Sequence, residues 1–351
     1  MQYFAIIDKR LCNLVAAAVK LVDTPDLGSG GASRGGSSPS SRTISGKSMK
    51  TKSNLKQALE NKRFVITAET SPPDAADAES VLKRAGCLKN VVDAVNVTDG
   101  AGAKPHMSAL ATAAILAQNG IEPVLQFTTR DRNRIAIQGD LIGGWALGIP
   151  NILCLYGDDI TVGDQPDSKK VHDIDSKQLM ETAKIMKNEG TFPTGRKIDP
   201  KPELFIGAAD LPRRPEKDFN ASGLLAKISA GADFFQTQFA FDINALKEYM
   251  KVINDAGVTE KAYYIVGLGP LASAKSAKWM DANLFGVNIP EAVIKRIEGA
   301  DNEKLEGQKI CIELLEQFKE IDGIHGAHLM GPRQEQSIAD LVSNAGLGVD
   351  N

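Results

Sequence analysis

The sequence predicts an α/β fold of the closed (β/α)8 type, a TIM barrel. From residue 63 onward, short runs rich in β-branched residues alternate with runs of helical period, which is typical of βα units and a parallel sheet. Eight such repeats occupy about 285 residues, a length that favours a closed barrel over an open sheet. No G-x-G-x-x-G follows the first predicted strand, so the dinucleotide fingerprint of the open alternative is missing from this position.

Each predicted strand is followed by a predicted helix. The strands are expected at residues 63–69, 94–99, 123–129, 151–158, 204–210, 234–240, 262–269 and 323–330. The helices are expected at residues 78–86, 107–120, 134–148, 176–190, 222–231, 243–257, 273–284, 289–321 and 334–346. Several of these helices end in glycine just before the next strand, which predicts left-handed C-caps.

The composition narrows the class of partner. A formal net charge of -3 and a pI near 5.9 argue against nucleic acid or an anionic membrane surface as the main partner. Only 5% of residues are aromatic, so no stacking platform for bases is expected. The four cysteines lie far apart without a C-x-x-C pair, and the four histidines form no ligand pattern, so we expect no metal site and a cytoplasmic location.

The amino-terminal part of the chain differs from the rest. Residues 11–22 are apolar but too short to span a bilayer, and residues 28–48 form a Gly/Ser tract that cannot bury enough apolar surface to become ordered. We therefore expect residues 1–48 to be a disordered and dispensable extension. Residues 49–351 are expected to form a single (β/α)8 catalytic domain.

Polar residues gather at the predicted carboxyl ends of the strands, where barrel enzymes carry their chemistry. They are Glu69, Thr98, Gln126, Thr128, Thr129, Asp158, Asp210, Gln238 and the turn 267–269. Carboxylates, amides and hydroxyls without a His or Cys cluster suit proton transfer and hydrogen bonding to a polar heteroaromatic ring. An ordinary structural role stays open for each of them: Asp158 could cap a loop, and residues 98–100 could form a plain turn.

Glu69 is the strongest single candidate. It ends an apolar strand and precedes Thr70-Ser71-Pro72-Pro73, a segment expected to form a rigid turn that fixes its direction. A carboxyl group in that position is expected to be partly desolvated, which suits a general acid.

Four segments resemble known motifs in the same chain order. Residues 68–73 (AETSPP) resemble F-E-F-F-P-P, residues 97–101 (VTDGA) resemble V-T-Y-G-A, residues 153–158 (LCLYGD) resemble a strand ending in L-R-G-D, and residues 229–242 resemble D-A-G-A-x-x-x-x-T-Q-F-F-F-D. Together they resemble the methylenetetrahydrofolate reductase family over roughly residues 60–345. The resemblance is to the prokaryotic type, the catalytic barrel without the S-adenosylmethionine-binding domain.

The resemblance implies reduction of 5,10-methylenetetrahydrofolate to 5-methyltetrahydrofolate by NADH or NADPH through a bound flavin. It implies that Glu69 is the acid that assists opening of the five-membered ring, and that Asp158 stabilises positive charge on the folate. Gln238 and Arg333 would also bind the substrate, and Lys227 would meet the flavin phosphate. The implied cofactor contacts are Thr98, Asp99, Ala101, Gln126, Thr128, Tyr156, Gly157, Asp158, Asp210, Arg214, Asn220 and Lys227.

The sequence also departs from the family pattern. Gln126 replaces a flavin-contacting histidine, Tyr156 replaces the arginine of R-G-D, and Asp210 replaces a tyrosine. Insertions at about residues 159–175 and 190–203 are expected to lengthen the mouth of the barrel. These departures leave FMN open as an alternative to FAD, and they leave NADH, NADPH and a partner protein open as electron donor.

Two other functions stay open at this stage. One is a flavoprotein reductase that acts on a different one-carbon carrier or as a subunit of an electron-transfer complex. The other is a non-catalytic barrel that only binds folate or flavin. The expected assembly is a homo-oligomer, with a partner electron-transfer subunit as a further option.

Overall fold

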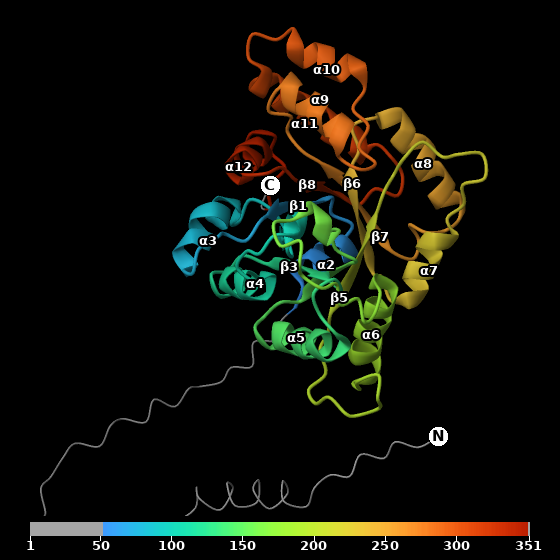
Figure 1. Ribbon diagram of the computed structural model, residues 1–351. Coiled ribbons are helices and arrows are strands. Elements are labelled where there is room, and N and C mark those ends of the chain that lie inside the picture. The colour runs from blue at the N-terminus through green and yellow to red at the C-terminus, as the bar shows by residue number, and fades with distance from the viewer. Residues whose placement is uncertain (1–51, 350–351) are drawn as a thin grey trace, which may run out of the picture. The chain divides into compact units, whose positions relative to one another are not determined.

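Eight parallel strands close into a barrel in the computed structural model, which describes residues 52–349 (Figure 1). The strands are β1 (Val65–Thr70), β2 (Ala94–Val97), β3 (Pro123–Thr128), β4 (Asn151–Leu155), β5 (Phe205–Asp210), β6 (Phe234–Phe239), β7 (Tyr263–Leu268) and β8 (Gly326–Leu329). Strands that are consecutive in the chain are neighbours in the sheet, and β8 pairs with β1 to close it. This confirms the (β/α)8 prediction.

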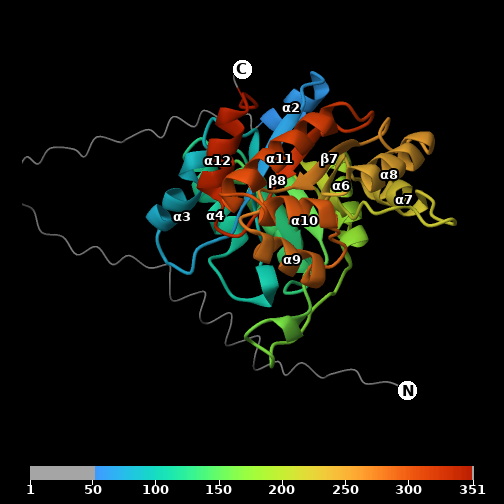
Figure 2. The same cartoon turned by 90° about the horizontal axis from the view of Figure 1, so that it is seen from above.

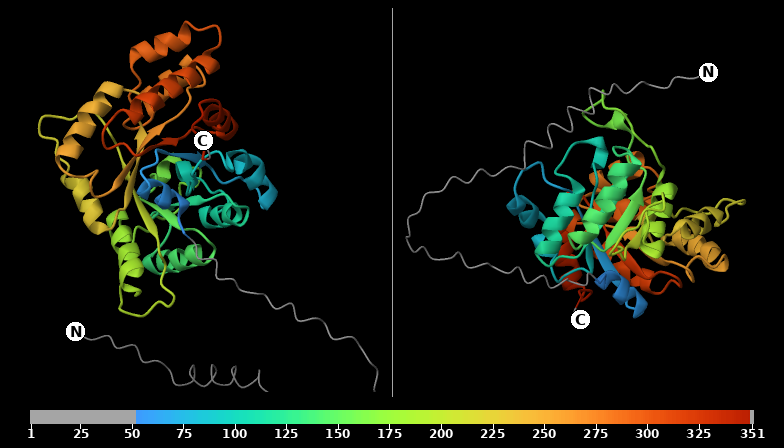
Figure 3. Two further views of the ribbon diagram at one scale, coloured as in Figure 1. Left: turned by 180° about the vertical axis from the view of Figure 1, so that it is seen from behind. Right: turned by 90° about the horizontal axis from the view of Figure 1, so that it is seen from below.

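Helices surround the strands, as the views from above, behind and below show (Figures 2 and 3). They are α2 (Asn54–Glu60), α3 (Ala78–Ala85), α4 (Ala109–Gln118), α5 (Arg134–Ala146), α6 (Ser176–Glu189), α7 (Ser222–Ala230), α8 (Ile243–Asp255), α9 (Ala274–Asn283), α10 (Glu291–Glu298), α11 (Glu303–Lys319) and α12 (Glu335–Asn344). Short 3-10 turns are η1 (Gly86–Leu88), η2 (Ala101–Ala103) and η3 (Ile160–Val162). Within residues 52–349, no helix is long and apolar enough to cross a membrane.

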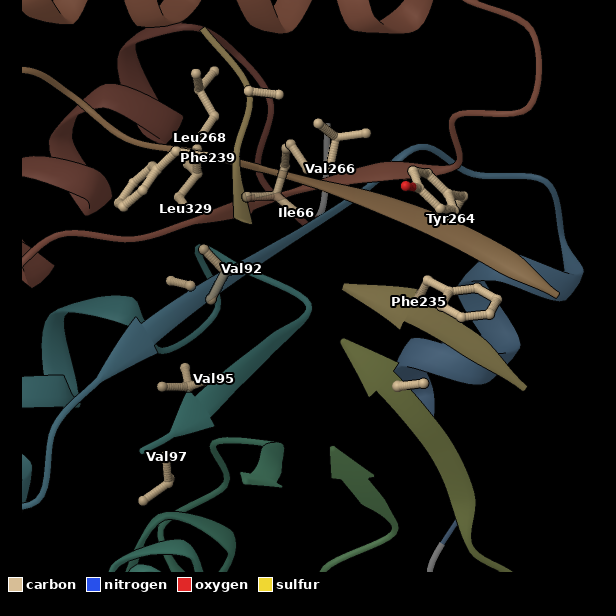
Figure 4. Packing of buried hydrophobic residues seen from close by; sticks show 14 of the residues in the cluster. Ile66, Val92, Val95, Val97, Phe235, Phe239, Tyr264, Val266, Leu268 and Leu329 are labelled. Atoms are coloured by element: carbon tan, nitrogen blue, oxygen red, sulfur yellow. The ribbon is translucent and has the colours of Figure 1, made fainter. Parts of the chain in front are cut away.

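Apolar side chains on the outer face of the strands form the main core against the helices. Ile66 of β1, Val95 of β2 and Val266 of β7 belong to this layer and are at most 1% exposed (Figure 4). Side chains of a strand alternate between its two faces, so the intervening residues point into the barrel. That alternation places Glu69 and Thr98 on the inside.

The amino-terminal end of the barrel is filled by a second apolar cluster. Phe205 and Phe234 stack there with ring centroids 4.7 Å apart, and Leu55 and Leu59 of α2 pack beneath them. The carboxylate of Glu122 accepts hydrogen bonds from the backbone N–H groups of residues 54 and 55, which holds the N-terminus of α2 in place. A substrate can therefore enter the barrel interior from the opposite end, where the strands carry their polar residues.

Several local predictions need adjustment. The helical stretch predicted at 289–321 is two helices, because α10 ends at Glu298 with Gly299 as its C-cap and Asn302 caps the start of α11. The predicted left-handed cap is confirmed at Gly190, with φ of 65°, and wrong at Gly86, with φ of -61°. The helix α2 was not predicted. The expectation for residues 1–48 lies outside the described residues and stays a prediction.

Candidate active site

A polar layer crosses the interior of the barrel next to the second apolar cluster, on the side of the carboxyl ends of the strands. The side-chain amides of Asn96 and Gln236 donate to each other's oxygens over 2.6 and 3.1 Å. Gln236 also donates to Thr67 Oγ1 over 3.0 Å, and Thr67 Oγ1 lies 2.9 Å from His328 Nδ1. All four residues are at most 3% exposed. Because buried polar groups are costly unless paired, this mutual pairing makes the layer a rigid floor for the mouth.

Glu69 stands on this floor at the end of β1. Gln126 of β3 donates its side-chain N–H to Glu69 Oε2 over 2.8 Å, and His328 Nε2 lies 3.8 Å from the same oxygen. Since Gln236 donates to the Thr67 hydroxyl, that hydroxyl is free to donate to His328 Nδ1, which favours the tautomer with its N–H on Nε2, facing Glu69. The Glu69 side chain is 25% exposed, so the expected partial desolvation is confirmed.

A β-bulge shapes the mouth next to Gln238. The register of β6 against β7 shifts between Gln236 and Phe239, and the carbonyl oxygens of Thr237 and Gln238 turn toward β7. They lie 2.3 and 2.6 Å from the place that a Cβ atom would take on Gly267, so only glycine fits there. Bulges beside active sites re-aim side chains, and this one brings Gln238 to the barrel's upper rim.

The carboxylate of Asp99 bonds to Thr128 and Arg132. It accepts from the backbone N–H and the hydroxyl of Thr128, and it forms a two-point ion pair with Arg132. The Asp99 side chain is 8% exposed. The structure therefore gives Asp99 and Thr128 a role in joining the ends of β2 and β3, and direct cofactor contact by Asp99 stays a prediction.

The insertion at residues 159–175 lies at the carboxyl ends of the strands, as predicted. Its His172 stacks on Tyr156 with ring centroids 3.8 Å apart and bonds to the Thr129 hydroxyl, and Gly163 packs against the backbone of Ala103. The prediction that the insertion at 190–203 lengthens the mouth is wrong. This insertion connects α6 to β5, and helix-to-strand connections lie at the amino ends of barrel strands, away from the mouth.

Asp210 does not join the other polar residues. Its carboxylate accepts hydrogen bonds from the hydroxyls of Tyr249 on α8 and Tyr264 on β7, and Tyr264 belongs to the outer core (Figure 4). Burial, followed by the nearby Asp210 charge, raises the pKa of both tyrosines, so both remain donors. The expectation that Asp210 faces the mouth is wrong, because its position in β5 directs it to the helix side.

Three other predicted cofactor residues also contact protein groups. Arg214 pairs with Glu248, the Asn220 side chain accepts from the N–H of residue 222, and Lys227 donates to the carbonyl of residue 209 over 2.6 Å. Arg333 is exposed on the loop after β8 and has a left-handed backbone, with φ of 58°. The exposed Asp158 accepts from the backbone N–H of residue 102 over 2.8 Å, next to Ala101 and Gly157.

Thr98 supplies an observation that points to a ligand. Its hydroxyl oxygen is buried and has no hydrogen-bond partner among residues 52–349. Thr98 directly follows β2, and the alternation along that strand places its side chain inside the barrel mouth. A buried hydroxyl without a partner costs free energy, and a bound polar ring would satisfy it. The Thr98 hydroxyl could therefore bond a polar ring bound in the mouth, whereas the side chains of Arg214, Asn220 and Lys227 are already paired with protein groups.

We expect Thr98→Val to weaken flavin binding without lowering the stability of the protein. In the ligand-free protein the free energy of unfolding should stay level or rise by about 1 kcal/mol, because an unpaired hydroxyl is removed. Flavin affinity should fall roughly tenfold, the scale of one lost hydrogen bond. Thermal unfolding and fluorescence titration with FAD and FMN measure the two effects.

Thr112 offers a matched control. Its hydroxyl is also buried without a partner in the described part of the chain, but it lies on α4 and not in the mouth. Thr112→Val should change stability in the same direction and leave flavin affinity unchanged. Equal flavin affinity in the wild-type protein and Thr98→Val would remove Thr98 from the proposed site.

Sequence reasoning missed two contributors. No local pattern marks His328, which faces Glu69 from a position 259 residues away in the chain. The segment 130–134, between the predicted strand at 123–129 and the predicted helix at 134–148, was given no functional role, although its arginines tie three strand-end loops together. The signal for the second was visible: three arginines and an aspartate directly after a strand are unusual for an ordinary loop.

The fold and this site define a TIM-barrel protein whose polar centre lies at the carboxyl ends of the strands. A model of the methylenetetrahydrofolate reductase family matches residues 54–346, and the chain belongs to that family. The resemblance drawn from the four sequence motifs is thereby confirmed.

Individual relatives are distant. A probable methylenetetrahydrofolate reductase (NADPH) of Caenorhabditis elegans is 23% identical over 253 residues, 70% of this chain and 35% of the relative. A 5,10-methylenetetrahydrofolate reductase of Salmonella typhimurium is 24% identical over 258 residues, covering 71% of this chain and 80% of the relative. The chain thus spans about a third of the nematode protein and most of the bacterial one.

A solved structure shares the fold. It is an uncharacterized protein from Clostridium thermocellum that binds two copies of 5-methyl-5,6,7,8-tetrahydrofolic acid. The TM-score is 0.58 at 16% identity, over 83% of this chain and 97% of the other.

Proposed function

We propose that the chain reduces 5,10-methylenetetrahydrofolate to 5-methyltetrahydrofolate, with NADH or NADPH as donor and a flavin as bound cofactor. The observation that carries the proposal is Glu69, a partly buried carboxyl group held by Gln126 above a rigid polar floor, at the end of the first barrel strand. Family membership and the names of the relatives support the folate substrate.

Glu69 would supply the proton that the reaction needs. Opening the five-membered ring breaks the bond between the methylene carbon and one ring nitrogen, and the departing nitrogen must take up a proton. A carboxylic acid within reach of that nitrogen provides it, and the hydrogen bond from Gln126 favours a fixed orientation of the carboxyl group. Asp158, exposed at the rim, would stabilise the positive charge that ring opening leaves at the other nitrogen.

The remaining residues would bind and orient. Gln238 at the bulge and Arg333 on the loop after β8 would hold the folate, and Thr98 with Gln126 would bond the flavin ring. The flavin, once reduced by the nicotinamide donor, would provide the hydride that the methylene carbon accepts. The insertion held by the Tyr156–His172 stack would limit the access of water to this side of the mouth.

The absorption spectrum of the purified protein tests the proposal. We expect the visible bands of oxidised flavin, their loss on addition of NADH or NADPH without oxygen, and their return on addition of methylenetetrahydrofolate. Extraction of the flavin distinguishes FAD from FMN. A protein that takes up neither flavin, or whose reduced flavin is not reoxidised by methylenetetrahydrofolate, would contradict the proposal.

A further inference from the structure

Arg130 is a buried arginine directly behind the mouth. It follows the end of β3 by two residues and is 3% exposed, which is rare for an arginine unless its charge and N–H groups are paired. Its Nε and Nη2 donate to the carboxylate of Asp131 over 2.7 to 3.1 Å. The side-chain hydrogen bond to Asp131 is the largest influence on the Arg130 pKa and raises it, so the guanidinium stays charged.

The other N–H groups of Arg130 reach two different loops. Nη2 donates to the carbonyl of Gly100 in the β2–α4 loop over 3.2 Å, and Nη1 donates to the carbonyl of Asp158 in the β4–α6 loop over 3.3 Å. Arg130 therefore joins the turns that follow β2 and β4 across its own strand end.

The two turns are fitted closely around the guanidinium. A Cβ atom on Gly100 would lie 2.3 Å from Arg130 Nη2, and one on Gly157 would lie 3.0 Å from Arg130 Cβ. Both glycines also have left-handed backbones, with φ of 57° and 98°. Only side-chain-free turns can approach a buried arginine this closely, so the loops and Arg130 form one unit.

This unit determines where the Asp158 carboxylate points. Asp158 Oδ2 accepts the backbone N–H of Gly102 over 2.8 Å, a bond between the same two loops that Arg130 joins. Arg130 thus fixes both sides of that bond: the peptide of Asp158 on one loop and the turn before Gly102 on the other.

We propose that Arg130 is a positioning residue that acts on folate reduction through Asp158. The proposal deepens the function proposed above and rests on it. Arginine suits the task because its planar group donates in several fixed directions at once, whereas lysine donates from a single atom. Arg130→Lys keeps the charge but can hold only one of the two loops.

Amide hydrogen exchange in the ligand-free protein tests the structural half of the proposal. In Arg130→Lys, the Gly102 amide should exchange faster, while amides of the barrel core keep their protection. Arg134→Lys is the matched control, because Arg134 lies on the same segment but pairs with the exposed loop residue Asp173. Unchanged protection of Gly102 in Arg130→Lys would overturn the proposal, as would a uniform loss over the whole barrel.

A double-mutant cycle with Asp158→Asn tests the functional half. Arg130→Lys alone should slow reoxidation of reduced flavin by methylenetetrahydrofolate on the order of tenfold, below the roughly hundredfold cost of a full 1 Å misplacement. In the Asp158→Asn background the same change should have almost no further effect, because the carboxylate that it positions is gone. Equal effects in both backgrounds would overturn the proposal. A chain without folate activity would instead refute the proposed function, and the exchange result would still stand by itself.

Discussion

Replacement of Glu69 by glutamine is expected to slow reoxidation of the reduced flavin by methylenetetrahydrofolate on the order of a hundredfold or more, the usual scale for a general acid. Glutamine has the same shape and can still accept the hydrogen bond from Gln126, so the fold should be unaffected. It has no acidic proton to give to the departing nitrogen. Stopped-flow measurement of the flavin absorbance follows this step directly.

Two controls make the result specific. Reduction of the flavin by NADH or NADPH in the same variant needs no proton from Glu69 and should change by no more than a few-fold. Glu335→Gln is the matched substitution: Glu335 is also buried, but it bonds to the Thr70 hydroxyl from α12. It should keep the wild-type folate rate. A Glu69→Gln protein with wild-type folate rate would favour the alternative of a barrel that only binds folate or flavin.

Phe234→Ala is expected to lower the free energy of unfolding by about 3–5 kcal/mol, the usual cost of removing a buried aromatic ring. Phe234 is 0% exposed and fills the amino-terminal end of the barrel. Its ring lies 4.7 Å from that of Phe205 and occupies the space that a Cβ atom on Gly207 would need. The surrounding strands are closed into a ring and cannot collapse into the cavity, which places the cost in the upper part of the range.

Denaturant titration measures the loss, and Phe285→Ala is the control. Phe285 is 84% exposed, so its removal should change stability by no more than about 0.5 kcal/mol. A loss below about 1 kcal/mol for Phe234→Ala would mean that the interior repacks, which would contradict the rigid floor that the site geometry requires.

Local sequence pattern was sufficient for the architecture. The predicted strand at 234–240 is β6 (Phe234–Phe239), and that at 262–269 is β7 (Tyr263–Leu268). Periodicity is a property of neighbouring residues, so runs of this length can be recognised without knowledge of the fold. The last strand is shorter than predicted, Gly326–Leu329 instead of 323–330, because glycines and histidines give no sharp boundary.

Elements stabilised by distant residues were harder to predict. The helix α2 has only seven residues, too short to be stable by itself, and depends on Glu122 of the β2–β3 connection. The hydrogen-bond partners of Asp210 were also not predictable from nearby residues. Its place at a strand end, on the helix-facing side, follows from the alternation along β5, but the tyrosines of α8 and β7 that donate to its carboxylate lie far away in the chain.

The sequence by itself determined the closed barrel, the family and the position of Glu69 at the first strand end. Alternating apolar runs and short motifs carry that information within a few residues of one another. Only the tertiary structure decided which groups surround Glu69: Gln126 lies 57 residues away in the chain and His328 lies 259. It also decided that the tyrosines of α8 and β7 donate to Asp210, and that Arg130 joins two loops. Barrel closure brings the ends of separate strands together, and no local pattern specifies which side chains then meet.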